Sequence, residues 1–166
     1  DSAALLDATA GCLRGDPYWA PPVKRSFLKE TETDPGRLRI AFTAKAPTDK
    51  PVHEDCVRAV EEAARLCEEL GHSVEESAPV IDGKTLTRAF VVLWFAGIAS
   101  IVKMLGVSKE QVEPLTWAIY EQSQTASAAD YLIAVSTIQR VARDVASFFE
   151  KYDILLTPTL AKPPAP

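Results

Sequence analysis

Two short stretches of alternating hydrophobic positions enclose one long stretch with helical spacing. Residues 38–44 and 72–77 alternate between larger apolar side chains and small or charged ones. Between them, residues 52–70 carry apolar side chains every three or four positions, at Cys56, Val60, Ala63, Cys67 and Leu70. Alternation is typical of a strand, and a spacing of three to four is typical of an amphipathic helix. The pattern predicts a right-handed βαβ unit with two parallel strands.

Three helical stretches and one apolar strand are expected further along the chain. The helices cover roughly residues 84–105, 108–122 and 127–152, and Ser127 begins the last of them with a capping pattern. The apolar face predicted for this last helix is Tyr131, Val135, Ile138, Ala142, Val145, Phe149 and Tyr152. Residues 154–156 form an unbroken apolar run, typical of a parallel strand covered on both faces. The sequence therefore predicts an α/β fold whose three strands form one parallel sheet.

The beginning of the chain has a different character. Residues 1–11 show helical spacing, which places Ser2 on a helix. Three prolines then keep the following loop extended. Tyr18 and Trp19 in this loop are expected to pack against a core. We expect this segment to be an ordered loop.

Composition and charge narrow the class of protein. A chain of 166 residues is long enough to bury the core of one domain, and its net charge of -5 without a basic face excludes a nucleic-acid surface. Cys56 and Cys67 fall on one predicted helix, about 16 Å apart at ~1.5 Å per residue, which is too far for a disulfide. We therefore expect a cytoplasmic protein. The longest uncharged run, residues 89–102, is shorter than the ~18–20 residues of a membrane span, so no membrane contact is expected.

Few side chains in this sequence point to chemistry. The two histidines lie at the start of a predicted helix, His53, and just beyond its end, His72, where solvated or capping roles are expected. No pair of cysteines or histidines has metal-ligand spacing, and no glycine-rich phosphate loop occurs. The residues alone therefore predict no catalytic residue, no metal and no cofactor.

The uncharged run at residues 89–102 has two interpretations. Aromatic residues at helical spacing are typical of a core helix. The other interpretation is a pocket wall, because Gly97 and its small neighbours leave room beside Trp94, Phe95 and Ile98. Space beside bulky apolar groups is what an acyl pocket requires.

Three stretches resemble the amidase signature family, in the family's order and spacing. The stretch "DSAALLDATAG" with "GDPYWAPP" resembles the segment that follows the catalytic region, and "RLRIAF" with "VHEDCVRAVEEAARLCEELGHSVEE" resembles the next βαβ unit. The stretch "YDILLTPTLAKPPAP" resembles a later strand and proline loop, and the 6-aminohexanoate cyclic-dimer hydrolase type is the most similar. The resemblance implies the amidase-signature fold, with mixed or parallel strands flanked by helices. It also implies hydrolysis of a carboxylic amide through a Ser, cis-Ser, Lys triad.

The triad motifs of the family lie N-terminal to the part that this chain resembles. Ser2 follows the signature and matches no triad member, so no catalytic residue is carried over. The resemblance implies that residues 1–166 are a single segment of an amidase domain, incomplete at both ends, that contributes scaffold and acyl-pocket wall. The substrate-binding residues that it implies are Trp94, Phe95, Ile98 and Thr157.

The expected partners follow from this interpretation. They are a small-molecule amide, bound by the complete enzyme, and either the remainder of the parent chain or a second copy. Bare strand edges and apolar faces around Phe90, Trp94 and Ile98 would otherwise be exposed to association. The alternative is a free-standing α/β binding or interaction module without catalysis, which would lack an encoded glycine- and serine-rich signature before Asp1.

Overall fold

The computed structural model describes residues 1–164, which divide into two compact units. The first unit, Asp1–Gly36, contains α1 (Ser2–Thr9) and α2 (Phe27–Glu30). The Asp7 carboxylate of α1 accepts hydrogen bonds from the backbone N–H groups of Phe27 and Leu28, at 2.7 and 3.0 Å. These bonds satisfy donors at the start of α2 and tie it to α1.

The loop between these two helices is more exposed than expected. Tyr18 is 88% exposed and Trp19 is 68% exposed, so the prediction that these side chains pack against a core is wrong for this unit. Residues 1–36 contain no buried side chain, which leaves the two rings without a core to contact. Ser2 does lie on a helix, as predicted.

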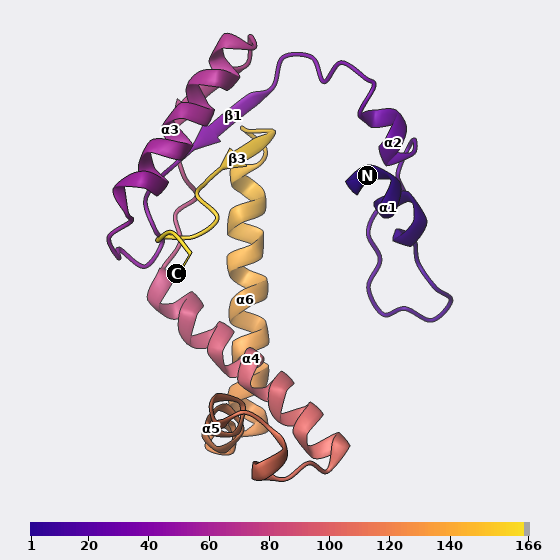
Figure 1. Cartoon of the computed structure of the whole chain (residues 1–166), viewed down its shortest axis with the longest axis vertical. Coiled ribbons are helices and arrows are strands. Elements are labelled where there is room, and N and C mark those ends of the chain that lie inside the picture. The colour runs from indigo at the N-terminus through magenta and orange to yellow at the C-terminus, as the bar shows by residue number, and fades with distance from the viewer. Residues whose placement is uncertain (165–166) are drawn as a thin grey trace. The chain divides into compact units, whose positions relative to one another are not determined.

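The second unit, from Arg37 onward, is built on a three-stranded parallel sheet with the order β2-β1-β3, of which Figure 1 labels β1 and β3. The strands are β1 (Arg39–Phe42), β2 (Ser73–Glu76) and β3 (Ile154–Leu156), and β1 pairs in parallel with each of the others. The predicted parallel sheet is therefore confirmed. Ile154 is 41% exposed, because β3 pairs only with β1 among the described residues. The prediction that this strand is covered on both faces is wrong here.

Helix α3 (Glu54–Glu69) connects β1 to β2 and runs beside the sheet in Figure 1. Val60 and Ala64 are its buried residues, and Cys56 and Cys67 share the helix as expected. The apolar face ends at Cys67, because the helix ends before Leu70, which is 67% exposed. His53 is the N-cap, as expected for a capping residue: its Nδ1 accepts a hydrogen bond from the backbone N–H of Asp55 at 3.2 Å.

A helical layer follows the second strand and comprises α4 (Gly83–Leu105), the 3-10 helix η1 (Lys109–Gln111), α5 (Pro114–Ser123) and α6 (Ala128–Phe148). Helix α4 packs against both α5 and α6. The predicted order of helices is confirmed, although the second begins at a proline and the third ends earlier than expected. Ser127 caps α6 in a reciprocal arrangement with Asp130, as its sequence pattern predicted.

The apolar face of α6 lies partly one position away from the predicted one. Its more buried apolar residues are Ala134, Val135, Ile138, Val141, Val145 and Phe148. Tyr131, Ala142 and Phe149 are exposed, so the predicted face is wrong at these three positions. Contact with α4 determines which residues of α6 are covered. The buried face of α6 therefore depends on how the two helices pack, and not on the spacing of its most hydrophobic residues.

Helix α4 is largely exposed, although its sequence resembles a core helix. Ala89, Ala99 and Val102 are buried, whereas Phe90 and Trp94 are 53% and 51% exposed. The expectation of bare apolar groups on this helix is thus confirmed at both rings. Within residues 1–164, α4 alone has the length and composition of a membrane-crossing helix, with 17% of its apolar window buried.

Candidate functional site

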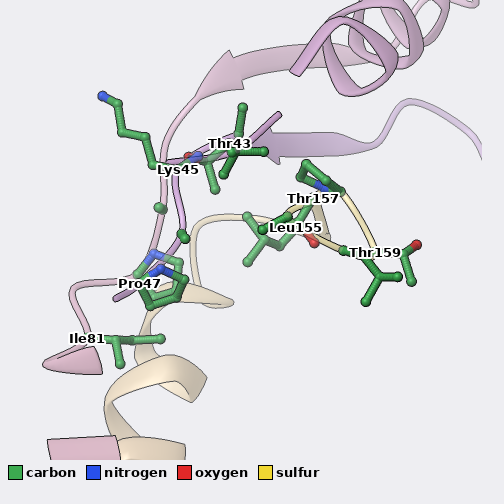
Figure 2. Close-up of a pocket in the computed structure, with 15 residues that line it drawn as sticks. Thr43, Lys45, Pro47, Ile81, Leu155, Thr157 and Thr159 are labelled. Atoms are coloured by element: carbon green, nitrogen blue, oxygen red, sulfur yellow. The ribbon is translucent and has the colours of Figure 1, made fainter. Parts of the chain in front are cut away.

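A pocket opens where β1 and β3 end, at the carboxyl edge of the parallel sheet. It has a volume of about 390 Å³ and is lined by residues 43–47, by Val52, by the segment before α4 and by the chain that follows β3 (Figure 2). Small-molecule sites of α/β sheets occur at this edge, and volumes of ~300–1,000 Å³ are usual for them. Its place and size make this pocket the candidate site.

The walls are apolar, with a few hydroxyl groups. Pro47, Ile81 and Leu155 supply aliphatic surface, and Thr43, Thr157 and Thr159 supply hydroxyls. Lys45 also lines the pocket, but its side chain is 85% exposed and forms an ion pair with Glu76 at 3.5 Å. Such a lining suits an apolar group attached to a polar one that accepts hydrogen bonds.

Backbone hydrogen bonds hold the segments of the pocket in place. The backbone N–H of Thr43 donates to the carbonyl of Leu156 at 3.0 Å, which extends the ladder between β1 and β3. The buried Thr43 hydroxyl accepts from the N–H of Lys45 at 3.1 Å. The N–H of His53 donates to the carbonyl of Ala161 at 2.8 Å, so the chain after β3 is attached to the start of α3. These bonds fix the rim on two sides.

An ion pair fixes β3 against β1 at the opposite edge of the sheet. The Arg39 guanidinium donates to both carboxylate oxygens of Asp153, at 2.8 and 3.1 Å, and the Arg39 N–H donates to the same carboxylate at 2.8 Å. These hydrogen bonds lower the pKa of Asp153 to about 2 and raise the pKa of Arg39. Because the pair precedes β3 directly, it helps to set the strand register on which the position of Thr157 depends.

The substrate-binding residues predicted from the resemblance lie in two places. Thr157 lines the pocket at the sheet edge. Trp94, Phe95 and Ile98 lie on α4, where the Trp94 ring centroid is 5.8 Å from that of Phe95 and 6.0 Å from that of Phe90. Among the described residues, none of the three on α4 lines the pocket that contains Thr157.

Sequence reasoning missed the other two hydroxyls of the pocket. Thr43 follows β1 directly, and Thr159 lies two positions beyond Thr157. The carboxyl ends of parallel strands meet at one edge of a sheet, so threonines at the ends of two predicted parallel strands were a usable signal, although the strand predicted at residues 38–44 still contained Thr43. Within residues 1–164, no cluster of three His, Cys, Asp or Glu side chains could hold a metal ion.

Comparison with known proteins gives a consistent result. A family model described as Amidase matches residues 1–166. A putative amidase of Synechocystis sp. is 35% identical over 158 residues, which cover 95% of this chain and 29% of the relative. The structure of 6-aminohexanoate cyclic dimer hydrolase complexed with substrate superimposes with a TM-score of 0.84 at 23% identity, over 92% of this chain and 34% of the other.

A bacterial aryl acylamidase of the amidase signature enzymes superimposes with a TM-score of 0.80 at 20% identity, over 96% of this chain and 34% of the other. The chain therefore spans about a third of the length of the relatives that it matches. The solved structures share its fold, and the family model matches it along its whole length. The chain belongs to the amidase family.

Proposed function

We propose that this chain provides scaffold and acyl-pocket wall to an amidase, whose Ser, cis-Ser, Lys triad lies on residues outside these 166. The observation that carries the proposal is the match of the amidase family model to residues 1–166. The apolar pocket at the sheet edge supports the role as a wall, because it could receive the acyl part of an amide.

In this proposal the triad carries out the chemical steps, and this chain binds the substrate. A serine hydroxyl attacks the amide carbonyl, the amine leaves, and water then releases the acyl group from the serine. Residues of this chain take no part in these proton transfers. Their contribution is to hold the acyl group, with Leu155 and Ile81 against its carbon chain and the Thr157 hydroxyl free to donate to a polar atom.

The aromatic face of α4 has a related role in this proposal. Trp94, Phe95 and Ile98 flank the acyl channel once the rest of the amidase polypeptide covers α4. The support is the exposure of Trp94, together with the open space beside Gly97, where an added Cβ would meet no atom within 4 Å. The remainder of the parent chain is therefore the proposed partner of this face, with a second copy as its substitute.

Hydrolysis of 4-nitroanilides tests whether the chemical steps require residues outside these 166. The complete protein is expected to release 4-nitroaniline from the acetic or hexanoic anilide, whereas residues 1–166 alone should show only the uncatalysed rate. Turnover by these 166 residues that disappears in Ser2→Ala or His53→Ala would contradict the proposal, as would a complete protein that cleaves no amide.

The role of Thr157 has its own test in the complete protein. Thr157→Val keeps the shape of the side chain and removes its hydroxyl, which should lower kcat/KM about tenfold, the usual scale of one hydrogen bond. Thr125→Val is the matched control, because the Thr125 hydroxyl is exposed and donates to the carbonyl of Gln122. Equal kinetics in the two variants would remove Thr157 from the proposed site.

A free-standing binding module remains the second candidate. It is favoured by one observation, which is the pocket of about 390 Å³ among the described residues of the second unit. Binding of hexanoic acid by residues 1–166, measured by calorimetry, together with a complete protein inactive on every anilide, would favour this module over the amidase.

A further inference from the structure

The start of α4 touches a pocket-lining loop more closely than any side chain would permit. Gly83 is the first residue of α4 and is buried. A Cβ added to it would lie 2.0 Å from the carbonyl oxygen of Pro47, 2.5 Å from the Pro47 carbonyl carbon and 2.9 Å from the backbone nitrogen of Thr48. All three atoms are backbone, so no side-chain rotation relieves the overlap.

Glycine is required at this position for close approach and not for backbone freedom. Five other glycines of the chain have a positive φ, and Gly83 does not. An alanine could therefore adopt the backbone conformation of Gly83, but would not fit against Pro47. Separating its Cβ from the Pro47 oxygen by 3.0 Å instead of 2.0 Å takes a displacement of about 1 Å.

The helix side of this contact is well held. The Asp82 carboxylate caps α4 by accepting from the N–H groups of Lys84 and Thr85, each at 3.1 Å, and from the Thr85 hydroxyl at 2.6 Å. The Thr87 hydroxyl donates to the Gly83 carbonyl at 2.7 Å. A side chain at position 83 would therefore displace the loop that contains Pro47 more readily than the start of the helix.

This loop is a wall of the candidate site. Pro47 lines the pocket, and so does Ile81, two residues before Gly83. The contact between Gly83 and Pro47 thus joins two parts of the same wall, although Gly83 itself does not line the pocket.

We propose that Gly83 is a positioning residue that sets the shape of the acyl pocket, and with it the preference for longer acyl groups. This inference rests on the proposed amidase function. A long acyl group reaches the wall that Pro47 and Ile81 form, whereas an acetyl group is too short to depend on it. Displacement of the wall should therefore weaken binding of long acyl groups selectively.

The test compares two substitutions by alanine at neighbouring positions of α4 in the complete protein. Gly83→Ala should raise KM for the hexanoic 4-nitroanilide about tenfold and leave kcat and KM for the acetic 4-nitroanilide nearly unchanged. Lys84→Ala is the control, since the Lys84 side chain is exposed on the first turn of the same helix and does not line the pocket, and it should change neither substrate. Loss of activity that is equal for both anilides, or no change in their ratio, would overturn the proposal.

A second readout separates this proposal from the proposed function. Amide hydrogen exchange of residues 44–49 should become faster in Gly83→Ala and stay unchanged in Lys84→Ala. Faster exchange supports displacement of the loop even in a protein that cleaves no anilide, in which case the amidase function alone fails. Unchanged exchange contradicts the proposal. If Gly83→Ala does not fold, Pro47→Gly/Gly83→Ala is measured against Pro47→Gly, because a glycine at position 47 lets the loop yield.

Discussion

In the sheet of the second unit, Ile40 and Ala41 of β1 are 3% and 0% exposed, whereas Phe90 and Trp94 of α4 are each about half exposed. All four of these side chains are apolar. The two regions differ in neighbours, because β1 has a strand on each side, and α4 contacts α5 and α6 along one face. Burial in this chain is thus set by the elements available for packing and not by hydrophobicity alone.

Polar contacts sharpen the difference between the two regions. Two side-chain contacts connect the strands of the sheet. One is the Arg39–Asp153 ion pair, and the other is the hydrogen bond that the hydroxyl of the buried Tyr152 donates to the Glu75 carboxylate of β2. These contacts join segments far apart in the sequence. Among residues 83–148, side-chain hydrogen bonds stay within single helices and their caps, so packing alone holds the helices of this layer together. We expect the sheet to be the more stable region.

The largest expected effect comes from one substitution made in both regions. Ile40→Ala removes a buried side chain of β1 and should lower the free energy of unfolding by about 2–5 kcal/mol. Ile101→Ala, on α4 where the side chain is 53% exposed, should change it by less than about 1 kcal/mol. Urea denaturation of both variants measures the difference. Equal losses would mean that the exposed face of α4 is covered in solution.

A smaller effect is expected at the cap of α6. Ser127→Ala removes the hydroxyl that accepts from the Asp130 N–H and should cost about 0.5–2 kcal/mol of stability. Ser136→Ala, at an exposed position within the same helix, is the control and should be neutral or slightly stabilising. Thermal unfolding followed by circular dichroism compares them. A control that loses as much as the cap variant would argue against the capping role.

The smallest effect concerns the pH dependence of the sheet. The pKa of Asp153 is lowered from its ordinary 3.8 to about 2, mainly by hydrogen bonds from Arg39. A carboxylate with a lowered folded pKa adds stability above the unfolded pKa, and this stability is lost as the pH falls through the folded pKa. Between about pH 4 and 2, the wild type should therefore lose its advantage over Asp153→Asn. The free energy of unfolding of both proteins is measured across that range. A difference between them that stays constant with pH would contradict the lowered pKa of Asp153.

The sequence was sufficient for features that depend on local spacing. The alternation at residues 38–44 and the helical spacing at 52–70 predicted a strand and a helix, because side-chain periodicity reflects which face is buried. The helical crossover between the two predicted strands indicated a parallel pairing, because a connection of that kind returns the chain to the same end of the sheet. The resemblance to the amidase family also concerned local stretches, and it held along the chain.

Features that depend on distant partners could not be predicted in this way. The pairing of Arg39 with Asp153 depends on β3 lying beside β1, and no local pattern contains that information. Exposure at Tyr18 and Trp19 was missed because aromatic residues suggest a core whether or not one is present. The role of Gly83 depends on a loop some 35 residues earlier in the chain, at Pro47–Thr48, so a glycine at the start of a helix carried no signal.

Sedimentation equilibrium of residues 1–166 at tens of micromolar tests the central claim most directly. The exposed apolar face of α4 is proposed to be covered by other polypeptide, so the isolated chain should self-associate. Phe90→Ser/Trp94→Ser should reduce the association, and Tyr18→Ser, at a still more exposed ring of the first unit, should reduce it less. A monomeric wild-type chain that melts cooperatively would contradict the account and favour a free-standing module.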